Sequence, residues 1–326
     1  MSTYQPKSFI SGGKDAVAAA SYCPKKLTLI HTGVAVAASF LVALLTYLLG
    51  TGIGETGGLS GISSRAALET AQSLLELAVS TLSPFWALGF VAAALRMARR
   101  EEFTPKTLLQ GFRYWAPALR MLLLQGVLYF CVILISAQVG SFLFMMTPFS
   151  AHFNALAEQL AAAGTTEPDA LTQLLMQLDY DSLLRLFWSM APFLLLPALI
   201  ACLLLSYRLR LAQFLLMDHP EMGALFAILQ SIRLSKRNCL KLFRLDLHFW
   251  WFFALEVLVQ VLCYGDLILP LLGVELNMNG VLASFLFYAL ALVCQVGLYV
   301  WKKPQIMASY ALFYDHLLPQ ESEEEA

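Results

Sequence analysis

Six long apolar stretches constrain this chain more than any other feature of its sequence. An α-helix needs about 20 predominantly apolar residues to cross the hydrocarbon core of a bilayer, and every one of these stretches is that long. They cover approximately Leu29–Leu49, Leu74–Leu95, Leu119–Met146, Leu186–Ser206, Leu245–Tyr264 and Val281–Val300. The sequence therefore predicts an all-α, polytopic membrane protein with six transmembrane helices, joined on the cytoplasmic side by amphipathic helices.

The composition excludes most other classes of protein. Hydrophobic residues make up 59% of the 326 residues and charged residues only 13%, whereas soluble domains carry roughly 25% charged residues. A soluble protein of this size could not keep so much apolar surface away from water. We therefore expect neither a soluble globular protein nor a nucleic-acid-binding protein nor a disordered chain.

The positions of the cations predict the orientation of the spans. Nineteen of the 21 Lys and Arg residues fall in the N-terminal segment, the second and fourth connections and the C-terminal segment, and only Arg65 and Arg185 fall elsewhere. Loops rich in Lys and Arg stay in the cytoplasm. This distribution predicts a multi-pass protein of the cytoplasmic (cell) membrane with both termini in the cytoplasm.

The same reasoning divides the chain into three parts. We expect a cytoplasmic N-terminal segment at residues 1–28, a six-helix transmembrane domain at 29–318, and an acidic, disordered tail at 319–326. The outer connection from Pro148 to Arg185 has two runs of apolar residues at helical spacing, which predict two short amphipathic helices.

The connection after the fourth span predicts a basic amphipathic helix at the inner interface. Its cations recur at spacings of four, four and three, which would place them on one helical face, after an apolar stripe. The stripe is Met222, Leu225, Phe226, Leu229 and Ile232, and the cations are Arg233, Arg237, Lys241 and Arg244. The alternative is ordinary positive-inside topology without specific lipid recognition. A second amphipathic helix is predicted after the last span, from Ile306, Tyr310, Phe313 and Leu317.

Two further residues near this helix are candidates for contact with lipid headgroups or a partner protein. Arg208 ends the fourth span, and Asp246 lies beside Arg244 at the entry to the fifth, where an ion pair or a headgroup contact is expected. The complete candidate set is Arg208, Arg233, Arg237, Lys241, Arg244 and Asp246.

Glu256 is the one acidic residue deep inside a predicted span. An ionisable residue in the membrane is a functional hypothesis by default, and Gln260 lies one helical turn later. The residues that could face it are Gln125 and Gln138 in the third span and Tyr288 and Gln295 in the sixth. These side chains could form a polar seam for a proton or an ion. The alternative is a protonated Glu256 that is hydrogen-bonded to Gln295 or Tyr288 and joins helices.

No recognisable catalytic, metal-binding or cofactor-binding pattern is present. The six cysteines form no CxxC pair, the five histidines are scattered, and no nucleotide-binding motif occurs. We therefore expect a protein that is not an enzyme and has no metal or cofactor, and a lipid-processing enzyme is the weakest alternative.

The second half of the chain resembles the bacterial integral membrane protein family catalogued as domain of unknown function 975. The motifs that carry the resemblance are Tyr207-Arg208, Asp218-His219-Pro220, Ala224 to Ser231, Leu242 to Leu247, Pro304-Gln305, Ser309, Ala311 and Phe313-Tyr314. Two positions depart from the family pattern: Ser235-Lys236-Arg237 replaces Met-x-Gly, and Trp250-Trp251 replaces Gly-Trp. The resemblance implies a polytopic protein of a Gram-positive bacterium and brings no known activity or substrate.

These observations together favour a non-enzymatic membrane component. We expect its basic cytoplasmic face to engage membrane lipids through their headgroups, or another membrane protein. The alternative is a secondary transporter or channel that uses Glu256 in its pathway. The sequence does not predict an oligomeric state.

Overall fold

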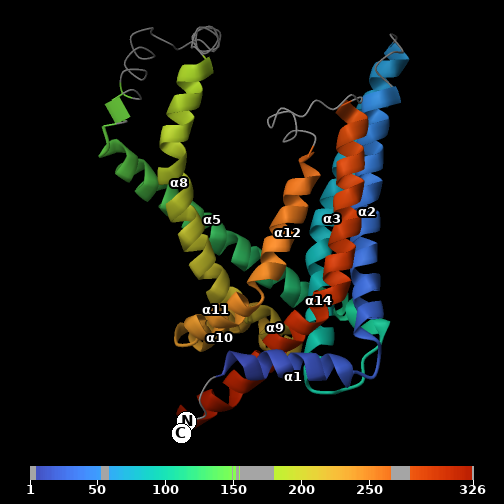
Figure 1. The fold of residues 1–326 in the computed structure, drawn as a ribbon, viewed down its shortest axis with the longest axis vertical. Helices are drawn as coiled ribbons and strands as arrows, with labels where there is room; N and C mark the ends of the chain where they lie inside the picture. The colour runs from blue at the N-terminus through green and yellow to red at the C-terminus, as the bar shows by residue number, and fades with distance from the viewer. Residues whose placement is uncertain are drawn as a thin grey trace. The chain divides into compact units, whose positions relative to one another are not determined.

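In a computed structural model, the described residues of the chain form helices and no strands. The description covers residues 5–52, 59–148, 150–151, 154, 180–265 and 280–324. The helices are α1 (Pro6–Ala18), α2 (Pro24–Gly52), α3 (Leu59–Ala98), η1 (Pro105–Leu109), α4 (Gln110–Arg113), α5 (Trp115–Met145), α8 (Tyr180–Leu209), α9 (Ala212–Asp218), η2 (Pro220–Met222), α10 (Gly223–Lys236), α11 (Cys239–His248), α12 (Trp250–Cys263) and α14 (Gly280–Glu324). Figure 1 shows their course.

The longest of these helices could cross a membrane. Five are both long and apolar enough to do so, and the count rises to six if the bent pair α11–α12 is taken as one span. The protein is thus an all-α polytopic membrane protein, as the sequence predicts.

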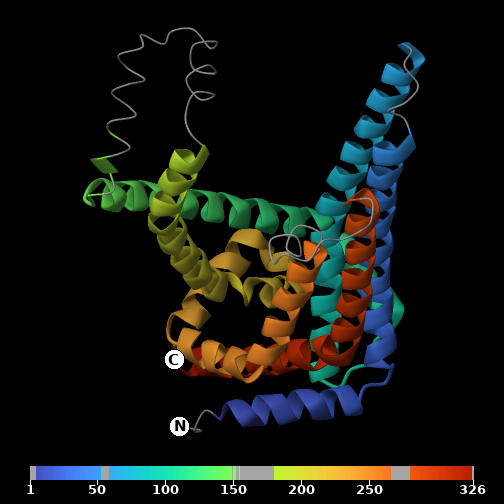
Figure 2. The same cartoon turned by 45° about the horizontal axis from the view of Figure 1, so that its top comes forward.

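The chain forms two compact units. Unit 1 consists of Met1–Leu122 and Arg210–Ala326, and unit 2 of Leu123–Leu209. In unit 1, α2, α3 and the N-terminal part of α14 lie side by side, and α1 packs across the C-terminal part of α14 (Figures 1 and 2).

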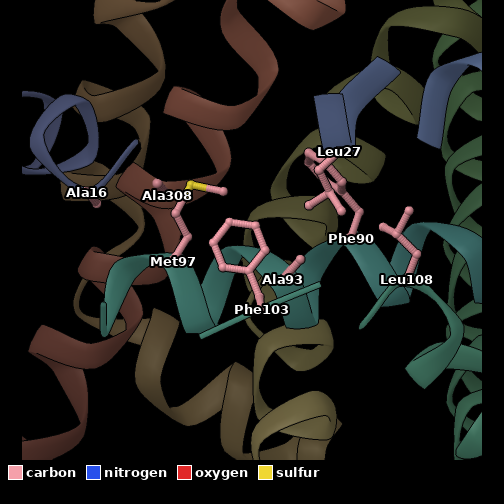
Figure 3. Close-up of a cluster of buried hydrophobic side chains, with 8 residues drawn as sticks. All are labelled: Ala16, Leu27, Phe90, Ala93, Met97, Phe103, Leu108 and Ala308. Atoms are coloured by element: carbon pink, nitrogen blue, oxygen red, sulfur yellow. The ribbon is translucent and has the colours of Figure 1, made fainter. Parts of the chain in front are cut away.

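A buried apolar cluster joins four of the long helices of unit 1. It brings together α1, α2, α3 and α14 with the segment that follows α3 (Figure 3). Its members are Ala16, Leu27, Phe90, Ala93, Met97, Phe103, Leu108 and Ala308. Close by, a Cβ on Gly89 would stand 1.8 Å from the carbonyl oxygen of Leu108. Only glycine allows α3 and η1 to approach so closely.

Unit 2 contains most of α5 and all of α8. These two helices meet at Gly140, where a Cβ would stand 2.3 Å from the carbonyl oxygen of Phe193. The rings of Phe144 and Phe193 also pack edge to face, 5.9 Å apart. The contact again depends on a small residue, as is usual between membrane helices.

The fifth predicted span requires a correction. Residues Leu245–Tyr264 do not form one continuous helix, because the backbone breaks at Phe249 and α11 is bent by 69° from α12. Only the part from Trp250 onward runs as a single helix. An uninterrupted apolar run carries no sign of such a break.

The segment at 1–28 contains helix α1 and the start of α2. At the other end, the predicted sixth span and the amphipathic helix predicted after it lie in one continuous helix, α14. The two short helices predicted in the outer connection from Pro148 to Arg185 lie largely outside the described residues.

Candidate functional site

Arg99 is the centre of a charged cluster at one end of unit 1. It directly follows α3, and its Nη1 and Nη2 atoms bind the carboxylate of Asp218 at 2.6 and 2.8 Å. A second carboxylate, Asp315 of α14, accepts a 2.7 Å hydrogen bond from Nη2. The hydroxyl of Tyr314 donates to Asp218 at 3.0 Å. These hydrogen bonds, first to Asp218 and then to Asp315, raise the pKa of Arg99, so the cluster links α3, α9 and α14 through a permanent cation.

A second cluster of the same design lies around Arg210. Its guanidinium group binds Asp246 of α11 at 2.5 Å and stacks over the ring of Tyr310, with the central carbon 4.2 Å from the ring centre. The Tyr310 hydroxyl accepts from Arg210 at 2.9 Å and donates to Asp246 at 2.6 Å. The carboxylate of Asp246 is therefore held from two sides.

The second cluster gives Asp246 a partner that the sequence does not identify. Its ion pair forms with Arg210, which is 36 positions earlier in the chain. Neither Arg99 nor Arg210 was a candidate from the sequence. The family-like motifs do contain Asp218 and Tyr314, but spacing along the chain gives no indication of which side chains they meet.

A polar cavity of about 340 Å³ opens beside the first cluster. Arg96 and Arg99 of the α3 end form part of its wall, with Gln110 and Tyr114 from the next helices. Glu101 and Glu221 add negative charge to the lining, together with Asp218. The mixed lining suits a small group that carries both signs of charge.

The predicted basic helix is divided in the structure. α10 ends at Lys236 and α11 begins at Cys239, so Arg233, Arg237, Lys241 and Arg244 do not share one face of one helix. Arg208 lies in the last turn of α8, which belongs to unit 2. The remaining cations stay together on the consecutive helices α10 and α11.

The apolar stripe of α10 faces away from the protein. The side of α10 that packs on unit 1 consists of small and branched residues, namely Ala224, Ala227, Ile228, Ser231, Leu234 and Ser235. The exposed side carries Leu225, which is 60% exposed, and Leu229. α11 continues this pattern with Leu240, which is 73% exposed, and Phe243. Large apolar side chains and cations thus share the outer surface of α10–α11.

Glu256 lies in a polar cluster between α12 and α14. Its carboxylate accepts a hydrogen bond from the hydroxyl of Tyr299, to which Gln295 also donates at 3.3 Å. The sequence places the partner on the correct helix, although the contact is to Tyr299, one turn beyond Gln295. Tyr288 is instead hydrogen-bonded to Ser39 of α2.

Gln260 of the predicted seam is exposed on α12. Gln125 and Gln138 belong to unit 2.

Two basic side chains, the half-buried Lys303 and the buried His31, extend the Glu256 cluster, and no sequence pattern singles them out. The Nζ atom of Lys303 lies 4.4 Å from the ring centre of Tyr299 and 5.5 Å from that of Phe90. The ring centre of His31 lies 4.7 Å from that of Phe90. His31 is only 6% exposed, and neither of its ring nitrogens has a hydrogen-bond partner among the described residues. Titratable groups from α12, α14 and α2 are therefore connected through shared aromatic neighbours.

Comparisons with known proteins place the chain in a family without assigning it a role. The family described as "Protein of unknown function (DUF975)" matches residues 33–321. No curated protein and no solved structure matches the chain. Within the described residues, no group of three or more His, Cys, Asp or Glu side chains is placed to hold a metal ion.

Proposed function

The chain belongs to the DUF975 family of proteins of unknown function, and on that premise we propose that it is a membrane component whose helices α10 and α11 bind anionic lipid headgroups. The observation that carries the proposal is the outer surface of these helices. It combines exposed leucines such as Leu225 and Leu240 with exposed cations such as Arg233 and Arg244. A helix with this surface lies in the plane of the interface, its apolar residues toward the acyl chains and its cations at the phosphates.

The bend between α11 and α12 supports this placement. α12 is apolar and continues toward the interior of the bilayer, and α11 is turned from it by 69°. When α12 crosses the membrane, α11 therefore lies closer to the membrane plane than to its normal. Asp246 and Arg210 hold α11 in that position, since their ion pair ties it to the start of α9.

The proposal includes the location and the orientation. We place α10–α11 at the inner leaflet of the cytoplasmic membrane, because the cation-rich segments of the sequence fall at this end of the spans. Labelling can test the orientation. Asn238→Cys, introduced into a cysteine-free chain, should react with a membrane-impermeant maleimide only after the cells are opened. Reaction in intact cells would overturn the orientation.

Lipid selectivity tests the function itself. In reconstituted vesicles, the EPR spectra of spin-labelled phosphatidylglycerol and phosphatidylcholine report how much of each lipid the protein immobilises. We expect selectivity for phosphatidylglycerol that decreases with added salt, because each cation near an anionic surface contributes about 1 kcal/mol. The combined change of Arg233, Arg237, Lys241 and Arg244 to Gln should remove most of this selectivity.

A matched variant controls for net charge. Lys7, Lys14, Lys25 and Lys26 are also four cations at the predicted cytoplasmic side, and changing all four to Gln should leave most of the selectivity intact. If both variants lost the same amount of selectivity, net charge alone would explain the effect, and a specific role for α10–α11 would be overturned. Selectivity that survives the α10–α11 changes would also overturn it and would favour a protein partner for this surface.

The Glu256 cluster supports a second function, proton or ion transport. The observation that favours it is the connected set of Glu256, Tyr299, Lys303 and His31 within the membrane helices, because ionisable residues at such positions mark ion and proton pathways. Vesicles loaded with a pH-sensitive dye should show protein-dependent proton flux that Glu256→Gln abolishes. Glu76→Gln, at an exposed acid of α3, should retain it. Flux that is unchanged by Glu256→Gln, or no flux above that of empty vesicles, would exclude proton transport through Glu256.

A further inference from the structure

An open apolar groove runs between α12 and α14 in unit 1. It has a volume of about 800 Å³, which lies within the range of about 300–1,000 Å³ typical of small-molecule sites. The residues that line it include Leu258 and Leu262 of α12 and Phe287 and Leu298 of α14, and none of the described lining residues is charged. The shape and chemistry of the groove suit a hydrocarbon chain.

A glycine keeps the groove open. Gly297 is exposed in the lining, and no other atom lies within 4 Å of the position that a Cβ would occupy there. Gly89 of α3, by contrast, has the backbone of Leu108 in that space. Gly297 is thus not required for close contact between α12 and α14. Its missing side chain leaves space at the surface.

One end of the groove carries a cation between two tryptophans. Trp301 lines the groove, and its ring centre is 5.3 Å from that of Trp251. The Nζ atom of Lys302 lies 5.2 Å from the Trp301 ring centre and 5.6 Å from that of Trp251. Lys302 also donates a 3.1 Å hydrogen bond to Gln305. Tryptophan rings mark the headgroup level of a membrane, so Lys302 is held at the depth of lipid phosphates.

We propose that this groove binds one anionic phospholipid, with an acyl chain along α12–α14 and its phosphate at Lys302. The groove alone cannot select a lipid, because a hydrocarbon chain gains little by moving from the bilayer to an apolar protein surface. The selection must come from the charge at the end of the groove. The site goes beyond the proposed function, since it uses neither the cations nor the exposed leucines of α10–α11.

Native mass spectrometry of the full chain, titrated with phosphatidylglycerol or phosphatidylcholine, tests the site. We expect one phosphatidylglycerol to be retained more tightly than any phosphatidylcholine. Gly297→Leu fills the groove and should weaken this binding at least fivefold. Gly33→Leu, at a glycine of α2 that also has no atom near its Cβ position, should leave it unchanged.

Lys302→Gln tests the headgroup contact separately from the acyl-chain contact. It should weaken the binding of phosphatidylglycerol about fivefold, the factor that corresponds to about 1 kcal/mol for one interfacial cation. The binding of phosphatidylcholine should be unchanged. Equal retention of the two lipids, or full retention by either variant, would overturn the proposal. The combined α10–α11 variant should keep this single tight lipid, so a failure of the groove and a failure of the proposed function give different results.

The thiol of Cys294 provides an independent readout that needs no substitution. Cys294 is exposed and lines the groove, and Cys131 is an exposed thiol of α5 in unit 2. Added phosphatidylglycerol should slow the alkylation of Cys294, resolved by peptide mass spectrometry, and leave that of Cys131 unchanged. Equal rates with and without lipid would overturn the proposal. So would a disulfide between the Cys294 residues of two chains, which would assign the groove to a second copy.

Discussion

The two units of the molecule differ in what surrounds their helices. In the most apolar 18-residue stretch of α3, in unit 1, 44% of the residues are buried inside the protein, whereas in the corresponding 18-residue stretch of the candidate span that contains most of α8, only 6% are buried. Yet α3 is the least apolar of the five candidate spans. Apolar character therefore does not identify the core of this protein. The most apolar helices are those that meet lipid, which is as apolar as leucine.

The polar side chains follow the same division. The two arginine clusters, the polar cavity and the Glu256 cluster all lie in unit 1. In unit 2, by contrast, the exposed surface of α8 includes Leu195, Leu199 and Leu203. Helices that pack on several neighbours can shield polar groups from lipid and supply their partners, and a pair of helices cannot. We infer that unit 1 carries both the structural core and the chemistry.

The strongest test of this contrast is Arg99→Ala. The substitution leaves the Asp218 and Asp315 carboxylates, which are only 12% and 27% exposed, without their cation. Removing the cation from carboxylates that are mostly buried is destabilising, and here we expect a loss of about 3 kcal/mol in the free energy of unfolding. Unfolding in mixed micelles by added dodecyl sulfate measures it. Arg100→Ala removes the same charge from an exposed neighbour and should cost much less, and equal losses would contradict a structural role for the cluster.

Glycine contacts give the next largest effect. In unit 1, Gly89→Ala would force its Cβ against the backbone of Leu108, and overpacking of this kind costs about 1–3 kcal/mol. In unit 2, Gly126 has no atom within 4 Å of its Cβ position, so Gly126→Ala should be neutral or should stabilise α5 by up to about 1 kcal/mol through helix propensity. The same unfolding assay compares them. If both substitutions changed the free energy of unfolding in the same direction, the difference in packing around the two glycines would not explain their effects on stability.

The sequence predicted the helices well because their cause is local. A run of about 20 apolar residues has few stable alternatives to a helix in a bilayer. Four of the six predicted spans lie within continuous helices, and a fifth, Leu119–Met146, extends only one residue past the end of α5. The breaks were not predicted. Phe249 interrupts a run with no proline or glycine, so its break is determined by tertiary packing.

The partners of the charged residues could not be predicted for a related reason. The sequence predicts an ion pair or a headgroup contact for Asp246 but does not identify its partner, Arg210, which lies 36 positions earlier in the chain. Arg99 meets Asp315 across 216 positions of the chain. Such pairs depend on how the helices pack, and a single sequence contains no local pattern that reports it. Glu256 was recognisable because one acidic residue in an apolar span stands out without any knowledge of its partner.

The smallest expected effect tests the contrast from the side of unit 2. Leu199 is 64% exposed on α8, and Leu199→Ala should change the free energy of unfolding by less than about 0.5 kcal/mol, as surface substitutions usually do. Leu108 is fully buried in unit 1, and Leu108→Ala should cost about 2–5 kcal/mol because it leaves a cavity. The two variants delete the same atoms, so the difference between them measures burial alone. A large loss at Leu199 would mean that this face of α8 is covered by protein, and the division between a protein core in unit 1 and a lipid-facing unit 2 would then fail.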